Sequence, residues 1–156
     1  MSALTTRFAL QLPTWIDDLA IDPDRTFDNH EDLMEFTVLL SRMNAEHETG
    51  GPFAATVVEL ETMKLVSFGV NVVVPQHCSL AHGEAVALMM AQTRLQTFDL
   101  GGESVPSLGL ATSGQPCIQC YGNLYWSGVR KLWIAARGDD VESITGFDEG
   151  PLPEDW

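Results

Sequence analysis

Basic residues are scarce in this sequence: eight Lys and Arg stand against 22 Asp and Glu, which leaves a formal net charge of -14. A field of that sign repels phosphate groups over a Debye length of about 8 Å at physiological salt. The composition therefore argues against nucleic acids and anionic membrane surfaces as partners.

The sequence also lacks any apolar run that approaches the ~20 residues of a membrane-spanning helix. Its first residues have neither the basic region nor the apolar core and cleavage site of a secretory signal peptide. We therefore expect a soluble, cytoplasmic protein. There is no internal repeat and no low-complexity tract, and 156 residues with 45% hydrophobic side chains are enough for one domain with its own core.

Cysteines are few and odd in number, since the chain has three. A disulfide framework uses an even number, so this count argues against one. Cys117 and Cys120 have the Cys-x-x-Cys spacing that is typical of metal or redox sites inside cells. Cys78 has no such spacing to the other two and is expected to be a buried or inactive thiol.

Hydrophobic periodicity predicts alternating helices and strands. Residues 1–29 show no sustained period, so we expect an irregular lead-in with room for one short helix. The predicted elements are a helix over 31–46, a hairpin of strands over 55–60 and 65–70, a helix over 82–96, a strand over 108–112, a helix over 117–126 and a strand over 131–136. This order predicts an α/β fold, a three-layer αβα sandwich with helices on both faces of the sheet, and places the main domain at residues 30–156.

His82, Cys117 and Cys120 form a candidate zinc site. All three lie at or near the predicted N-termini of two helices, where the helix dipole favours thiolate over thiol. Three such ligands leave the fourth position of a tetrahedral zinc ion open for water, whose pKa the metal lowers to about 7. Glu84 follows His82 closely enough to exchange protons with that water without binding the metal.

Either half of this pattern is weak alone, because a Cys-x-x-Cys pair also occurs in thioredoxin-like redox sites and in structural zinc knuckles. His-Gly-Glu at 82–84 followed by Pro-Cys-Ile-Gln-Cys at 116–120 is the combination of motifs that marks zinc-dependent deaminases. A closed structural zinc site is the alternative. Glu84 argues against it, since such a site needs no buried carboxylate beside an open coordination position.

Further motifs resemble bacterial guanine deaminases of the cytidine deaminase fold. They are Gly-Gly-Pro-Phe-Ala-Ala at 50–55, Asn71 with the following Val-Val-Val-Pro, Tyr-Trp-Ser-Gly-Val-Arg at 125–130 and Gly-Phe-Asp-Glu-Gly-Pro at 146–151. The Gly-Phe-Asp segment discriminates best, since cytidine and tRNA adenosine deaminases do not usually carry it. The resemblance covers residues 30–156 and implies a mixed sheet of the cytidine deaminase type, Zn²⁺ as cofactor, a homodimer, and hydrolysis of guanine to xanthine and ammonia.

The resemblance also implies roles for single residues. Glu84 would carry protons from water to the base and to departing ammonia. Asn71 would bind the base through its amide, and Glu149 would contact the substrate edge and help to shuttle protons. Phe53 and Trp126 are candidate walls of the pocket. From the residues alone the alternatives stay open: Asn71 as a turn residue, Glu149 on a solvated acidic face, and the two aromatic residues in the core.

Two features depart from the family pattern. Gly83 stands where alanine is common, and a helical glycine costs up to about 1 kcal/mol relative to alanine, so we expect slight loosening there. The chain ends at Trp156, whereas the related enzymes usually continue with a segment that in some closes the partner subunit's site. Three hypotheses follow: a deaminase of guanine or a related aminopurine, a deaminase of cytidine, ammeline or tRNA adenosine, or a catalytically silent zinc-binding subunit.

Overall fold

Four strands form one mixed sheet in the order β2-β1-β3-β4. The computed structural model describes residues 4–148 and 150. Strand β1 pairs antiparallel with both β2 and β3, and β4 pairs parallel with β3. In chain order the elements are α1 (Trp15–Asp18), α2 (His30–Glu46), β1 (Ala54–Glu59), β2 (Leu65–Val70), α3 (Gly83–Leu95), β3 (Leu108–Gly114), α4 (Ile118–Ser127), β4 (Lys131–Ala136) and α5 (Gly138–Thr145).

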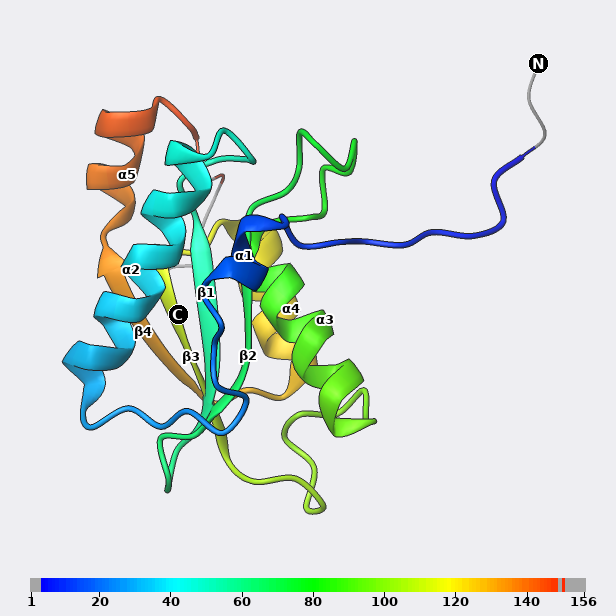
Figure 1. Cartoon of the computed structure of the whole chain (residues 1–156), viewed down its shortest axis with the longest axis vertical. Helices are drawn as coiled ribbons and strands as arrows, with labels where there is room; N and C mark the ends of the chain where they lie inside the picture. The colour runs from blue at the N-terminus through cyan, green and yellow to red at the C-terminus, as the bar shows by residue number, and fades with distance from the viewer. Residues whose placement is uncertain (1–3, 149, 151–156) are drawn as a thin grey trace.

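Helices cover both faces of this sheet. Helix α2 lies over one face, and α3 and α4 lie over the other (Figure 1). In β1, Ala55 and Val57 are buried in the cluster beneath α3 and α4, whereas Ala54 and Val58 are buried in the cluster beneath α2. Successive side chains of a strand point to opposite faces, so a strand covered on both sides is apolar along most of its length. The predicted three-layer αβα architecture is confirmed.

Helix α2 forms because its sequence supplies a cap and one apolar face. The Asn29 side chain accepts a hydrogen bond of 2.9 Å from the backbone N–H of Asp32 and so caps the N-terminus. The Thr37 hydroxyl lies 2.9 Å from the Thr56 hydroxyl of β1 and links the helix to the sheet. The buried residues recur at three- and four-residue spacing; they are Leu33, Phe36, Thr37, Leu40, Ser41 and Asn44.

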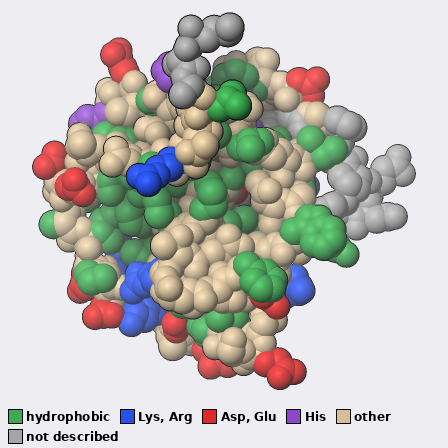
Figure 2. All heavy atoms as spheres, turned by 90° about the vertical axis from the view of Figure 1, so that its right-hand side faces the viewer, with side chains coloured by type: hydrophobic (Ala, Val, Ile, Leu, Met, Phe, Trp, Pro, Cys, Tyr) green, Lys and Arg blue, Asp and Glu red, His purple; other side chains and the backbone are tan. Residues whose placement is uncertain are grey.

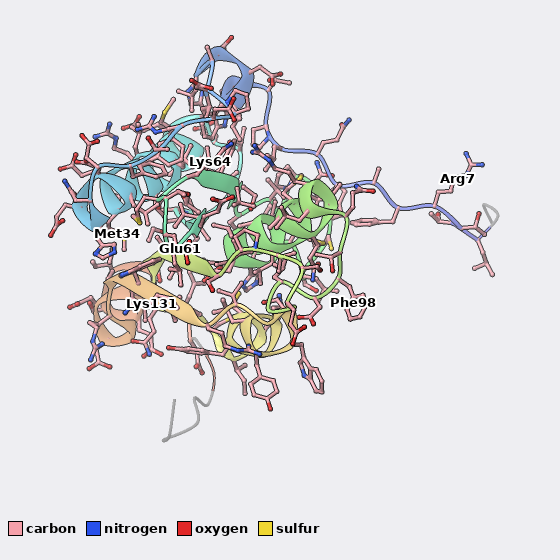
Figure 3. The ribbon with its side chains drawn as sticks, turned by 90° about the horizontal axis from the view of Figure 1, so that it is seen from below. Arg7, Met34, Glu61, Lys64, Phe98 and Lys131 are labelled. Atoms are coloured by element: carbon pink, nitrogen blue, oxygen red, sulfur yellow. The ribbon has the colours of Figure 1, made fainter. Side chains whose placement is uncertain are left out.

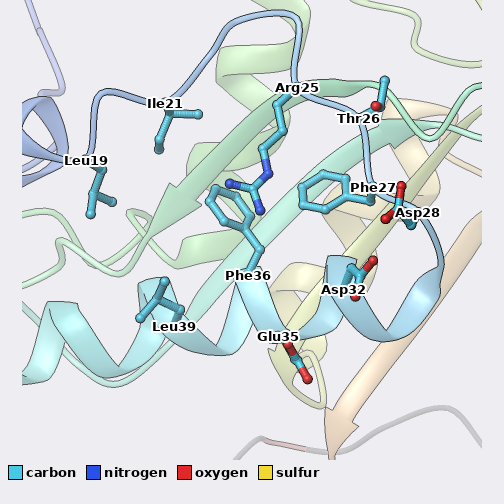
Figure 4. A pocket seen from close by; sticks show the side chains of 10 residues that line it. All are labelled: Leu19, Ile21, Arg25, Thr26, Phe27, Asp28, Asp32, Glu35, Phe36 and Leu39. Carbon is cyan, nitrogen blue, oxygen red and sulfur yellow. The ribbon is translucent and has the colours of Figure 1, made fainter.

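The lead-in before α2 packs on the same core. Trp15, Ile16 and Phe27 are buried in the cluster that contains the apolar face of α2. The Arg25 guanidinium lies 4.5 Å from the ring centre of Phe36 and 4.9 Å from that of Phe27, within cation–π range. Arg25, Phe27 and Phe36 line a cavity of about 600 Å³ between the lead-in and α2 (Figure 4). Part of the lead-in thus belongs to the packed body, although the predicted domain starts at residue 30.

The other predicted elements agree with the structure to within one or two residues at each end. Strand β3 continues past Thr112 because it pairs with β4 as far as Gly114. Helix α5 was not predicted, and its single buried residue, Val141, explains why, since one apolar position makes no periodic stripe. Within the described part of the chain, no helix is long and apolar enough to cross a membrane.

Candidate active site

Helix α3 begins directly after His82, which places the imidazole at the helix N-terminus. The backbone of His82 is extended, and its carbonyl accepts the first helical hydrogen bond from Val86 at 2.9 Å. A Cβ atom at Gly83 would lie 3.0 Å from the Cα of Ala54 and 3.1 Å from the carbonyl oxygen of Phe53. Glycine at position 83 therefore lets the start of α3 pack closely on β1. From the sequence, Gly83 was expected only to loosen the helix, and this close packing gives a structural reason for it.

Helix α4 begins in the same way after Cys117. Cys117 is extended and is the N-cap residue, and its carbonyl accepts a hydrogen bond from the backbone N–H of Tyr121 at 3.0 Å. Cys120 lies in the first turn and is fully buried. Both sulfur atoms are therefore close to the positive end of a helix dipole, which stabilises thiolates.

The ligand atoms of His82, Cys117 and Cys120 all lie within 4.8 Å of one another. The Nδ1 atom of His82 is 3.5 Å from Sγ of Cys117 and 3.6 Å from Sγ of Cys120. Zinc bonds of about 2.3 Å to sulfur and about 2.0 Å to nitrogen, at tetrahedral angles, put such atoms roughly 3.5 Å apart. The three residues therefore fit a tetrahedral zinc ion and leave its fourth position free.

The two thiols have very different pKa values. A hydrogen bond from the Cys120 thiol lowers the pKa of Cys117 to about 4, and the contact with His82 acts in the same direction. The same bond, together with burial, raises the pKa of Cys120. Cys117 is thus a thiolate at neutral pH, whereas Cys120 gives up its proton when it binds a metal, because thiols bind zinc as thiolates.

Glu84 is a buried carboxyl group beside the metal ligands. It lies in the first turn of α3 with 6% of its surface exposed, and the Thr112 hydroxyl donates to its Oε1 at 3.3 Å. Burial raises the pKa of Glu84. Hydrogen bonds from its own backbone and from Cys120 lower the pKa, but burial has the larger effect. The positive charge of a bound metal also acts to lower it. A buried carboxyl group beside the metal ligands can act as a general base and then as a general acid.

A cavity of about 490 Å³ opens beside these groups. Five of the residues that the sequence singled out line it together, namely Phe53, Asn71, His82, Glu84 and Cys117. They come from the start of β1, the end of β2 and the N-termini of α3 and α4, so the fold brings together segments that are far apart in the sequence. This arrangement places a metal site, a protonatable carboxyl group, an amide and an aromatic ring around one space of the size that small molecules occupy.

Asn71 lies where the chain turns after β2, beside the cavity. Its backbone N–H donates to the carbonyl oxygen of Phe53 at 2.9 Å, and its side-chain Oδ1 accepts from the backbone N–H of Val73 at 3.3 Å. It is therefore a turn residue that also lines the cavity. Because the oxygen has a second lone pair and the amide nitrogen has two protons, the side chain can still bind a polar ligand.

Several cavity residues were not identified from the sequence as individual site residues. The ring of Phe147 lies 6.1 Å from the ring of Phe53, at an angle of 55°, and both line the cavity. Asp148 lines it too, and the only signal for these two residues was the Gly-Phe-Asp segment. Gln115 also lines the cavity and accepts a hydrogen bond of 2.9 Å from the backbone N–H of Gly138. No spacing or composition pattern points to Gln115.

The structure does not bring Trp126 to this cavity. Its side chain is 83% exposed and lines a separate space of about 430 Å³, which we call the α3–α4 groove, together with Leu80, Met89 and Phe98. The reason is helical geometry: Trp126 follows Cys120 by six positions, which is about 240° around a helix axis. Glu149, which was predicted to be catalytic together with Glu84, lies outside the described residues.

The chain resembles known proteins in both sequence and fold. Residues 27–136 match the family model described as the cytidine and deoxycytidylate deaminase zinc-binding region. Guanine deaminase of Bacillus subtilis (strain 168) is 30% identical over 121 residues, which are 78% of this chain and 72% of that protein.

Two solved structures are more similar in sequence. A guanine deaminase from Nitrosomonas europaea superposes with a TM-score of 0.90 at 42% identity, over 99% of this chain and 84% of that chain. The protein NE0047 in complex with 2,6-diaminopurine superposes with a TM-score of 0.88 at 44% identity, over 95% of this chain and 77% of that chain.

Proposed function

Because the chain belongs to the cytidine and deoxycytidylate deaminase family of zinc-dependent enzymes, we propose that it hydrolyses guanine to xanthine and ammonia. The observation that carries this proposal is the buried Glu84 carboxyl group beside three residues that fit a zinc ion, with Glu84, His82 and Cys117 lining one cavity. Relatives at 30–44% identity include guanine deaminases and a protein bound to 2,6-diaminopurine, and this supports guanine as the base.

His82, Cys117 and Cys120 would hold the metal, whose Lewis acidity lowers the pKa of a coordinated water molecule. Glu84 would take up a proton as a water molecule adds to the ring carbon that carries the amino group, and would pass this proton to a ring nitrogen. It would then take the remaining proton from the added hydroxyl group and give it to the amine as the carbon–nitrogen bond breaks. One water molecule is consumed, the carbon–nitrogen bond breaks and ammonia leaves, so atoms and charge balance. Because its pKa is raised, the Glu84 side chain is suited both to take up a proton and to hold it until it is delivered.

The base itself would be held by Asn71 and Phe53. The Asn71 amide can donate and accept hydrogen bonds with the polar edge of a purine. Phe53 offers a ring face on one side of the cavity, and Phe147 lies within aromatic contact of it. We also assign Glu149 a contact with the substrate edge, on the strength of the Gly-Phe-Asp-Glu motif.

Ammonia release from a panel of bases tests the proposal. Zinc-loaded protein is incubated with guanine, guanosine, ammeline, cytidine and adenine, with Glu84→Gln as the control. Guanine turnover that the control lacks supports the proposal. Turnover of cytidine or ammeline in its place assigns another substrate, and bound zinc with no release from any base indicates the silent subunit. A tRNA substrate is disfavoured by the net charge of -14.

We further propose that the protein is a cytoplasmic homodimer that forms through the α3–α4 groove. No described residue that lines this groove is charged, although the chain carries a net charge of -14, so two copies can meet there with little repulsion. Figure 2 looks onto this side of the molecule and shows hydrophobic and uncharged surface across much of the middle of the view. Phe98, at the rim of the groove, lies on the side opposite Met34 of α2 (Figure 3).

Light scattering after gel filtration tests this interface. Met89→Asp, in the groove, should convert a dimer to a monomer, because a buried unpaired charge is costly at an interface. Ile144→Asp is the matched control, since Ile144 is 81% exposed on α5, away from the groove. A wild-type protein that is monomeric at all concentrations contradicts the proposal. Cell fractionation tests the cytoplasmic location.

A further inference from the structure

Asn44 is a fully buried amide that does not line the catalytic cavity. It lies near the end of α2, and its Nδ2 donates two hydrogen bonds of 2.8 Å, one to the carbonyl oxygen of Gly51 and one to that of Asn71. Its Oδ1 accepts a hydrogen bond of 2.9 Å from the Thr49 hydroxyl. Both protons of the amide nitrogen and one lone pair of the oxygen are therefore used, which is nearly the full bonding capacity of the side chain.

The two carbonyl groups that Asn44 binds belong to two residues that line the cavity. Gly51 lies in the loop that leads into β1, and Asn71 follows the end of β2; both line the cavity. Space between them is tight, because a Cβ atom at Gly50 would collide with the Asn71 carbonyl oxygen and lie 2.8 Å from Nδ2 of Asn44. The Asn44 amide thus joins two segments that are distant in sequence at the point where they border the cavity.

The same network reaches the lead-in. The indole N–H of Trp15 donates to the Thr49 hydroxyl at 2.8 Å, and the Trp15 ring stacks on His47 with centres 5.4 Å apart and planes 8° apart. One chain of hydrogen bonds therefore runs from α1 to the cavity wall, through Trp15, Thr49, Asn44 and the Asn71 carbonyl. Linked and buried hydrogen bonds of this kind hold their members in a single arrangement.

We infer that Asn44 is a positioning residue for the substrate, which acts through Asn71 and is braced by Trp15 of the lead-in. The inference rests on the proposed function, because it takes Asn71 as the residue that binds the base. Removing the amide takes one hydrogen bond from each of the three groups that it binds. The Gly51 carbonyl still accepts from the backbone N–H of Phe53, and the Thr49 hydroxyl still accepts from Trp15. The Asn71 carbonyl loses the bond that ties it to α2, and the Asn71 segment is then free to shift. A shift of about 1 Å in a binding group can cost roughly 100-fold in efficiency.

Asn44→Ala tests the inference against Thr37→Val. Thr37 is equally buried in the same helix and its hydroxyl also makes buried hydrogen bonds, but they lead to Leu33 and to the Thr56 hydroxyl and not to the cavity. Asn44→Ala should raise KM for the base roughly 10- to 100-fold, with a smaller change in kcat and unchanged zinc content. Thr37→Val should lower the melting temperature and leave KM unchanged. Equal KM values for Asn44→Ala and the wild type would overturn the inference.

A double-mutant cycle shows whether Asn44 acts through Asn71. If it does, Asn44→Ala should add little to the loss that Asn71→Ala already causes; additive losses would contradict the inference. Trp15→Phe keeps the stacked ring but removes the indole donor, so it should raise KM in the same direction by a smaller factor. This variant keeps the test open if Asn44→Ala fails to fold.

Hydrogen–deuterium exchange separates this inference from the proposed function. Without substrate, Asn44→Ala should speed exchange in residues 50–53 and 70–74, and Thr37→Val should not. A wild-type protein that deaminates no base refutes the proposed function, while the exchange experiment still decides whether Asn44 braces these segments. Unchanged exchange would overturn the bracing.

Discussion

Replacing Glu84 by glutamine separates proton transfer from metal binding. Glutamine has the shape of glutamate, and its side-chain oxygen can still accept the hydrogen bond that Thr112 donates at 3.3 Å. Its amide cannot take up a proton from water, and a positioned acid–base group contributes roughly 10²- to 10⁴-fold in rate. We therefore expect Glu84→Gln to lower kcat for guanine by roughly 10²- to 10⁴-fold with little change in KM.

The same substitution should leave stability unchanged or raise it. Burial raises the pKa of Glu84, so the carboxyl group is harder to ionise in the folded chain than in the unfolded chain. A raised pKa favours folding below the unfolded value of about 4.3, and this contribution is lost as the pH rises through the folded pKa. In metal-free protein at pH 7, Glu84→Gln should therefore have a Tm at or above that of the wild type. The difference should vanish below about pH 4.

The decisive assay combines ammonia release, zinc content and Tm on the same samples. Glu61→Gln is the matched control, because Glu61 is exposed in the turn between β1 and β2 (Figure 3). The control should match the wild type in all three measurements. Activity of Glu84→Gln within about threefold of the wild type, or loss of zinc from this variant, would refute the role of Glu84 in proton transfer, because a group that supplies at least about 10²-fold cannot be dispensable.

In metal-free protein, iodoacetamide should label Cys117 much faster than Cys120, and labelling should persist until the pH falls to the Cys117 pKa of about 4. Equal labelling by peptide mass mapping would contradict the thiolate assignment. Chelation of zinc should lower Tm and added zinc should restore it, because a bound metal stabilises the folded state. A Tm that is the same with and without zinc would contradict the proposed zinc site. Gly69→Ala should destabilise by about 1–3 kcal/mol in urea unfolding, because the methyl group would collide with the backbone nitrogen of Ala87. Gly122→Ala, with no neighbour within 4 Å, should stabilise α4 by roughly 0.5–1 kcal/mol, and the opposite order would refute the packing argument.

Local sequence patterns were enough to predict most helices and strands and the metal ligands. Helix α2 buries one face, so its apolar spacing shows in the sequence, whereas α5 buries only Val141 and was missed. His82 and the Cys-x-x-Cys pair were recognisable from His-Gly-Glu at 82–84 together with Pro-Cys-Ile-Gln-Cys at 116–120. The three-residue spacing alone brings two sulfurs into one helical turn.

Which side chains share the cavity was decided by the tertiary structure. Trp126 belongs to a motif but turns away from the metal ligands, and Asn44 reaches the cavity wall through a carbonyl 27 residues further along the chain. The raised pKa of Glu84 likewise depends on what covers the carboxyl group. The periodicity of one element shows which of its faces is buried but carries no information about the partner on that face, because the partner depends on how distant segments pack.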